Sequence, residues 1–179
     1  MKTILLLLLT VAGNILSAQN YLAQQGKIHF HSDAPIEDID AESSAATCLF
    51  DPTTKKVVAK VEIKTFVFPK PLMQQHFNES YLESDKYPEA LIDGVLVGDV
   101  PKKDGVYKVT LKATFDLHGV KQQRIIPAQI TMKGGQPVKA YAAFDVKLAD
   151  HNIKIPTAVV MKIAEVIKVD ATFVFNKVK

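Results

Sequence analysis

The stretch Val106–Leu117, with the sequence VYKVTLKATFDL, alternates apolar and polar side chains without a break. Side chains of a β-strand point alternately to its two faces, so one face here is apolar and the other is polar and charged. The stretch holds twelve residues, whereas a typical strand has about five or six. Long strands with one apolar face are typical of barrels with an apolar interior. The stretch therefore predicts a β-barrel around an apolar space.

The same two-residue period recurs in five other segments of the chain, residues 27–31, 57–64, 125–132, 138–148 and 167–175. Residues 43–50 and 89–98 are also expected to be strands, although apolar and polar residues are mixed on both of their faces. A closed barrel of about eight strands just holds side chains or one small ligand. Turns with glycine separate several runs, at residues 103–105, 118–119 and 134–135, as in β-hairpins. Because this spacing leaves no room for helical crossovers, we expect an all-β fold of about eight antiparallel strands.

One segment has helical rather than two-residue spacing. Between Pro71 and Tyr81, apolar and aromatic residues recur three and four positions apart, and Pro71 is acceptable in the first turn of a helix. We therefore expect one short helix over residues 71–81, which lies over the barrel and closes one end.

The N-terminus predicts export. Lys2 precedes an apolar run that begins at Ile4, and Leu16-Ser17-Ala18 is similar to a signal-peptide cleavage site. The apolar run is too short to span a bilayer, which takes about 20 helical residues. We therefore expect residues 1–18 to be a signal peptide and residues 19–179 to be one β-barrel domain without a membrane span. That domain would be periplasmic or secreted after cleavage.

Charge and cysteine content narrow the function classes. The chain has 22 Lys and Arg residues against 19 Asp and Glu residues, and its net charge of +3 is too small and dispersed to predict nucleic acid binding. Its single cysteine, Cys48, cannot form an intramolecular disulfide. No flanking cation would activate this thiol, so we interpret Cys48 as a packed strand residue.

Three motifs resemble the YceI-like family. The first is LMQQHFNE at residues 72–79, followed by LESDKYP at residues 82–88. The second is ATFDLHGV at residues 113–120, and the third is FDVKL at residues 144–148, followed by Asp150-His151. The resemblance extends from about Gly26 to Phe175. It implies a lipocalin-like antiparallel barrel, exported to the periplasm or beyond, that holds a long isoprenoid or acyl chain in its lumen and has no catalytic residues.

The resemblance and the strand faces together predict which side chains line the lumen. Alanines recur on the apolar faces of several strands and would hollow the interior, while phenylalanines would wall it. Small barrels also alternate large and small residues simply to pack solid, which is the alternative interpretation. The predicted ligand-binding residues are Phe30, Ala59, Phe77, Leu111, Ala113, Phe115, Ala128, Ile130, Ala140, Ala142, Phe144, Val169, Ala171 and Phe173.

Two other functions remain to be weighed against binding. An enzyme that acts on a lipophilic substrate in the lumen would need polar groups at inward positions, and few are visible. An outer-membrane barrel would need apolar outward faces, whereas the outward positions here include Lys108, Lys112 and Lys147. We therefore predict a binding protein, not an enzyme, for a long-chain apolar small molecule of polyisoprenoid, quinone or fatty-acyl type. The lumen enzyme is the alternative, and the sequence does not predict the oligomeric state.

His29 and His31 share one face of a predicted strand, at a spacing that some metal sites use. A metal site usually has three or four protein donors, and the sequence shows no further donor beside them. We interpret both histidines as solvated outward side chains and predict no metal and no cofactor. The acidic residues between Glu37 and Glu42 do not match a calcium-binding loop and are interpreted as a solvated loop.

Overall fold

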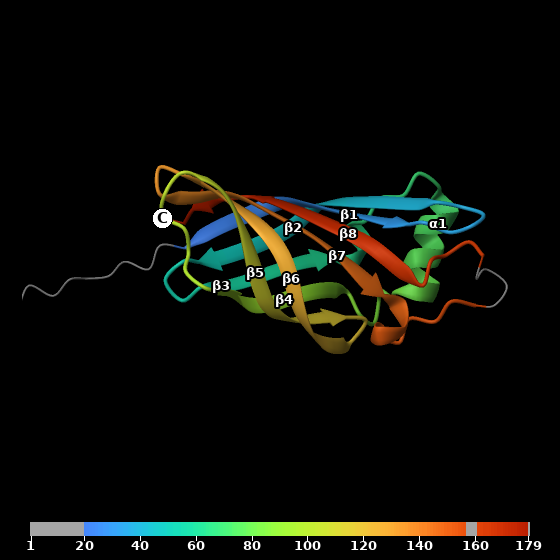
Figure 1. Cartoon of the computed structure of the whole chain (residues 1–179). Coiled ribbons are helices and arrows are strands. Elements are labelled where there is room, and N and C mark those ends of the chain that lie inside the picture. Colours follow the sequence, from blue (N-terminus) through green and yellow to red (C-terminus); the bar gives the residue numbers. More distant parts are fainter. Residues whose placement is uncertain (1–19, 157–160, 179) are drawn as a thin grey trace, which may run out of the picture.

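The computed structural model describes residues 20–156 and 161–178, so the predicted signal peptide, residues 1–18, lies outside the described residues. Eight long strands and one two-residue strand form a single sheet (Figure 1). They are β1 (Tyr21–Ser32), β2 (Ile39–Asp51), β3 (Lys56–Glu62), β4 (Glu89–Val97), β5 (Gly105–Leu117), β6 (Val120–Lys133), β7 (Gln136–Lys147), β8 (Val166–Val174) and β9 (Asn176–Lys177).

Neighbouring strands are antiparallel, and the sheet closes on itself. The strand order is β2-β3-β4-β5-β6-β7-β8-β1, and β1 pairs again with β2 from Tyr21–Phe50 to Ser32–Ile39. The short strand β9 pairs with the start of β1. The predicted all-β antiparallel barrel of eight strands is therefore confirmed.

Two of the predicted turns are two-residue hairpin loops. His118 and Gly119 join β5 to β6 with φ angles of 54° and 72°, and Gly134 and Gly135 join β6 to β7 with φ angles of 59° and 70°. Two successive residues with positive φ match the twist of the flanking strands. Glycine at position 119 also has a steric reason, because a Cβ atom there would lie 2.6 Å from Cε1 of Tyr87.

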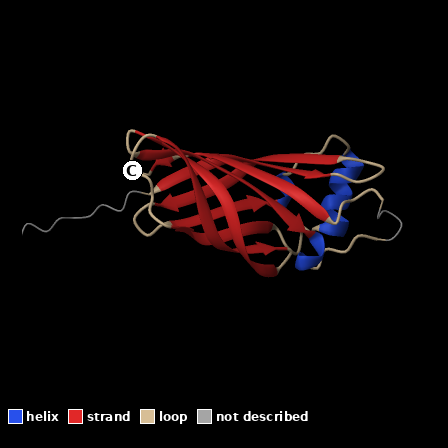
Figure 2. Cartoon of the chain, in the orientation of Figure 1, coloured by secondary structure: helices blue, strands red, loops and turns tan. Residues whose placement is uncertain are grey.

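Helical structure covers the segment predicted to be a helix. The α-helix α1 (Pro71–His76) has Pro71 in its first turn and continues directly as a π-helical turn, η2 (Phe77–Tyr81). Both lie at one end of the barrel (Figures 1 and 2). Two short 3₁₀ turns, η1 (Ile63–Thr65) and η3 (Leu148–His151), complete the helical elements of the described residues. No helix within residues 20–156 and 161–178 is long and apolar enough to cross a bilayer.

The end of the barrel away from α1 is closed by packed side chains. Tyr21, Phe50 and Met132 are each at most 3% exposed there, and the ring centroids of Phe50 and Phe175 lie 6.1 Å apart. Full burial of a large apolar side chain contributes about 1.5–3 kcal/mol. These residues therefore close this end of the barrel, and the space inside the barrel lies between them and α1.

Three strands begin earlier than the sequence predicts. β1 begins at Tyr21 rather than near residue 27, β2 begins at Ile39 rather than near residue 43, and β6 begins at Val120 rather than near residue 125. The register of β1 shifts between Ala23 and Ile28, which interrupts its two-residue period. The first part of β6 has polar residues on both faces, so alternation of apolar and polar side chains does not reveal it.

Candidate ligand-binding cavity

The barrel encloses an apolar cavity of about 520 Å³. All eight long strands contribute lining residues, and the helical segment α1–η2 covers one end. Several inward side chains, including Ile28, Val57 and Val109, are only partly buried because they face this space. Pockets for small molecules usually measure about 300–1,000 Å³ and are mostly apolar. The cavity therefore has the size and the surface of a site for an apolar ligand.

Thirteen of the fourteen predicted lining residues border this cavity. Phe77 contributes from η2, and the others contribute from six strands. They are Phe30 on β1, Ala59 on β3, Leu111 and Phe115 on β5, Ala128 and Ile130 on β6, Ala140, Ala142 and Phe144 on β7, and Val169, Ala171 and Phe173 on β8. Their contact with a ligand stays a prediction.

Ala113 is the exception. Its side chain faces inward and is only 3% exposed, but it does not border the cavity. It lies opposite Gly94 in the β4–β5 ladder, where a Cβ atom added to Gly94 would come within 2.5 Å of the Ala113 Cβ. Close approach of the two strands leaves no space beside Ala113. The structure therefore places it in the packed wall, contrary to the prediction.

Four phenylalanines, one of them on η2, form the wall of the cavity at its helical end. The ring centroid of Phe77 lies 5.5 Å from that of Phe30 and 4.9 Å from that of Phe68. The Phe66 ring lies 5.3 Å from Phe30, and such tilted or offset pairs add to the stability gained by burial. Phe66 and Phe68 are absent from the predicted lining. Their two-residue spacing just before Pro69 is the sequence signal that could have identified them.

Polar residues that border the cavity gather mainly at the end covered by α1. Glu37, in the loop after β1, accepts a hydrogen bond from the ammonium of Lys70, and this bond lowers the pKa of Glu37. Lys162 borders the same end. Ser32 is only 1% exposed, and its Oγ accepts a hydrogen bond of 2.9 Å from the backbone N–H of Ala164. The cavity is thus apolar along its length and polar at one rim.

Cys48 borders the cavity as a packed residue of β2. Burial raises the pKa of its thiol to about 12, so the thiol stays protonated at neutral pH. A protonated thiol is a poor nucleophile and a poor metal ligand. The interpretation of Cys48 as a packed strand residue is confirmed.

His29 and His31 lie on the outer surface of β1, where aspartates bind both rings. Nδ1 of His29 lies 3.1 Å from Asp170 Oδ1, and its Nε2 lies 3.0 Å from Asp40 Oδ1. Nδ1 of His31 lies 2.9 Å from the same Asp40 oxygen. Burial opposes the charged form of His29, but hydrogen bonds to Asp170 and Asp40 outweigh it and raise the pKa of His29.

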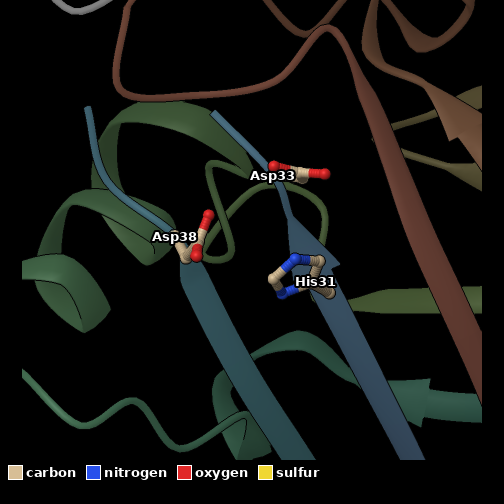
Figure 3. Close-up of side chains that lie close together, drawn as sticks. All are labelled: His31, Asp33 and Asp38. Atoms are coloured by element: carbon tan, nitrogen blue, oxygen red, sulfur yellow. The ribbon is translucent and has the colours of Figure 1, made fainter. Parts of the chain in front are cut away.

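His31 also has two acidic neighbours beyond Asp40 (Figure 3). Asp33 follows β1 and Asp38 precedes β2, so the loop between these strands brings both carboxylates close to the imidazole. One ligand atom from each of the three residues lies within 4.8 Å of the others. The expectation that no further donor lies near His31 is therefore wrong. Lys168 Nζ, 3.6 Å from Asp33, competes for that carboxylate, and the absence of a metal stays a prediction.

A second histidine pair ties the β5–β6 turn to η3. His151 is fully buried, and its Nδ1 lies 3.2 Å from the backbone oxygen of Val120. Its Nε2 has no hydrogen-bond partner among the described residues. Burial lowers the pKa of His151. Nδ1 of His118 lies 3.1 Å from the His151 carbonyl oxygen, and Nε2 of His118 lies 2.9 Å from Glu83 Oε2. These contacts fix the loops at the helical end of the barrel.

Known proteins share this architecture. A polyisoprenoid binding domain from Saccharophagus degradans, implicated in plant cell wall breakdown, has a TM-score of 0.70 at 15% identity, covering 89% of this chain and 99% of its own. BcnA of Burkholderia cenocepacia has a TM-score of 0.68 at 12% identity, covering 83% of this chain and 95% of its own. A Campylobacter jejuni YceI protein has a TM-score of 0.54 at 16% identity, covering 100% of this chain and 91% of its own. At these identities the similarity shows the fold alone.

The sequence itself matches a family. Residues 23–175 match the model of the YceI-like domain, which covers every long strand except the first two residues of β1. No curated protein matches the sequence significantly. The matched range includes the helical segment and all three motifs that resemble this family. The chain therefore belongs to the YceI-like domain family.

Proposed function

We propose that this protein is an exported binding protein that holds one long apolar chain, of polyisoprenoid, quinone or fatty-acyl type, inside its barrel. The observation that supports this most is the apolar cavity of about 520 Å³, lined by side chains of all eight long strands. Each methylene group that moves from water into such a space contributes about 0.8 kcal/mol. A chain that extends from the packed end toward α1 would gain this contribution along its whole length.

The arrangement of polar groups supports a chain with one polar end. Glu37, Lys70 and Lys162 border the cavity at the rim, whereas its interior is walled by aliphatic and aromatic side chains. A carboxylate, a hydroxyl or a quinone carbonyl would remain hydrated at this rim while the chain is buried. The description of the Saccharophagus degradans domain as polyisoprenoid binding makes an isoprenoid chain the first candidate.

Features of the sequence support export. Lys2, the apolar run that begins at Ile4 and the Leu16-Ser17-Ala18 segment together resemble a signal peptide. An exported binding protein could hold a chain that is poorly soluble in water outside the cytoplasm.

The lining favours binding over catalysis. Cys48 is a protonated thiol because burial raises its pKa to about 12. Burial likewise raises the pKa of Tyr81, so its hydroxyl also stays neutral. A lumen enzyme would need an activated nucleophile or an acid–base pair in contact with the substrate. Away from the rim with Glu37, Lys70 and Lys162, the described lining offers mainly apolar contact.

Titration of a fluorescent polyene fatty acid into protein stripped of lipid tests the proposal. We expect saturable binding of about one molecule per barrel and displacement by a long prenol, a long-tailed quinone or a fatty acid. The strongest competitor identifies the ligand class, and a short-chain alcohol is the control competitor. Ligand should also raise Tm in a concentration-dependent way. Absence of saturable binding, or equal displacement by the short alcohol, would contradict the proposal.

A further inference from the structure

The ladder between β6 and β7 is incomplete. It runs from Lys133–Gln136 to Ala128–Ala142 and then stops, although β6 continues back to Val120 and β7 continues on to Lys147. The ladders on either side extend further, from Gly105–Met132 to Leu117–Val120 between β5 and β6, and from Lys139–Val174 to Lys147–Val166 between β7 and β8. Figure 1 shows β6 and β7 diverging beyond the end of their ladder.

Side chains, rather than backbone hydrogen bonds, join the two strands beyond this point. Gln122 and Arg124 are on the same face of β6 as Ile126 and Ala128, because they are spaced by two residues. The Arg124 guanidinium donates to the Asp145 carbonyl oxygen, and Gln122 Nε2 donates to the Asp150 carbonyl oxygen at 2.8 Å. We call this part of the barrel wall, residues 120–127 and 143–150, the seam. Beyond the ladder the seam is held by these side-chain donors, by the His151–Val120 contact and by packing of Ile126 against Ala142 and Phe144. A seam without backbone hydrogen bonds opens more easily than a continuous ladder.

The cavity reaches the end of the seam at which the β6–β7 ladder stops. Ala128 and Ala142, the last pair of the ladder, both border the cavity, and Phe144 borders it one step further along β7. Gln129 and Tyr141 border it as well, although strand alternation directs both to the outer face. The cavity therefore reaches the outer face of the barrel between β6 and β7, next to the seam.

The outer face of β5, β6 and β7, which includes the seam and is called the seam face below, has more lysines than acids. The outward lysines of β5, β6 and β7 include Lys108, Lys112, Lys121, Lys139 and Lys147. In the described part of the chain, only Lys121 of these five has a carboxylate within 4.0 Å, namely Asp116 at 3.9 Å. Asp145 is the other acid on these outward strand positions.

The far side of the barrel differs. On β3, Lys56 contacts Asp93, and Lys60 Nζ lies 2.8 Å from Glu89 Oε1. The seam face thus has unpaired cations, whereas the β3–β4 face has ion pairs. Ile125, 74% exposed, lies on β6 beside Lys112 in the middle of the seam face. Unpaired lysines around an exposed apolar side chain are the pattern that binds an anionic lipid surface.

We propose that the outer face of β5–β7 docks on an anionic lipid surface and that the apolar chain passes between the bilayer and the cavity through the seam. This inference rests on the proposed function, because it presupposes an apolar chain as ligand. A chain that moves directly from lipid to lumen never exposes its methylene groups to water. Docking would bring the seam, rather than the rim near α1, to the bilayer.

Vesicle binding tests the docking face. The double variant Lys112→Glu/Lys139→Glu changes the charge of the seam face. The matched control Lys27→Glu/Lys56→Glu changes the net charge equally, at paired lysines of β1 and β3 that do not border the cavity. Each lysine near an anionic membrane accounts for roughly a fivefold change in binding. On vesicles of phosphatidylglycerol and phosphatidylcholine, we expect the seam-face variant to bind at least twentyfold more weakly and the control to stay within about threefold of the parent. Equal losses in both variants would contradict the docking face.

Transfer of a polyene fatty acid from the same vesicles tests the route. Gln122→Ala removes one donor from the seam without changing charge, and we expect it to speed transfer about threefold or more while vesicle affinity stays unchanged. Leu72→Ala, at the end covered by α1, is the control for the other route. Faster transfer in Leu72→Ala with no change in Gln122→Ala would overturn the seam as the entrance.

Equilibrium binding of the same fatty acid without vesicles separates this inference from the proposed function. The parent should bind it, and the two lysine double variants should bind it equally well. If the parent binds no fatty acid, the proposed function fails, and the inference fails with it. If binding is intact but the vesicle results go against the seam face, only the inference fails.

Discussion

Replacing Ala59 by phenylalanine should fill the cavity without unfolding the barrel. Ala59 borders the cavity from β3, where it pairs with Cys48 on β2 and Ile92 on β4. It is only partly buried although it faces inward. An added ring therefore has space to enter, and it would enter the volume that the proposed ligand needs.

The magnitude follows from the size of the cavity. A cavity of about 150 Å³ is enough to hold benzene, so one phenyl ring would take more than a quarter of the 520 Å³. If the ring displaces about three methylene groups of the bound chain, the binding free energy weakens by roughly 2.4 kcal/mol, which raises Kd about fiftyfold. The free energy of unfolding should change little, because the ring fills existing space.

Two matched variants control this experiment. Val58→Phe, one residue away, places the same ring on the outer face and should leave both Kd and stability nearly unchanged. Ala113→Phe places the ring where β4 and β5 approach each other at Gly94. It should destabilise the protein by about 1–3 kcal/mol, which lowers Tm by roughly 2–12 °C in a domain of this size.

Fluorescence titration with the polyene fatty acid and thermal unfolding should be measured for all three variants. If Ala59→Phe destabilises the protein as much as Ala113→Phe and leaves fatty acid binding unchanged, the barrel is packed at Ala59 and the reasoning fails. If Val58→Phe weakens binding as much as Ala59→Phe, the assignment of inward and outward faces is wrong.

Three further predictions concern the wall and the histidines. Gly94→Ala should lower the urea midpoint and reduce the free energy of unfolding by about 1–3 kcal/mol, because the added Cβ would lie 2.5 Å from both the Ala113 Cβ and the Lys112 carbonyl oxygen. An unchanged midpoint would contradict the close approach of β4 and β5. Burial lowers the pKa of His151, so below about pH 6.5 the unfolded chain binds more protons at this residue than the folded protein. When the pH is lowered from about 7.5 to 5.5, Tm should therefore fall more in the parent than in His151→Gln. An equal fall of Tm in the two proteins would show that folding does not oppose protonation of His151. Elemental analysis should find no stoichiometric zinc or iron, and bound metal that disappears in His31→Ala would reverse this prediction.

Much of the fold could be predicted because strand alternation is a local property of the sequence. Long runs such as Val106–Leu117 identify both a strand and its inward face, and the helical spacing of residues 71–81 identifies α1 and η2. The first part of β6 could not be identified, because Gln122 and Arg124 bond to carbonyl groups across the seam instead of contributing apolar side chains.

Positions in the site that depend on neighbouring strands could not be predicted. Ala113 and Ala59 have the same local pattern, and only the pairing of Ala113 with Gly94 places one in the packed wall and leaves the other beside the cavity. The proximity of Asp33 and Asp38 to His31 likewise depends on the loop that folds β1 back onto β2. Register and loop geometry are properties of the folded chain, so single-strand patterns do not contain them.

Native mass spectrometry of the protein purified from its own host, followed by solvent extraction, tests the central claim most directly. The account predicts a mass increment that corresponds to one molecule per barrel, and an extracted compound with a long isoprenoid or acyl chain. Ala59→Phe purified in the same way should lose most of this increment. Parent protein that shows only the mass of its polypeptide, and takes up no added prenol, quinone or fatty acid, would contradict the account.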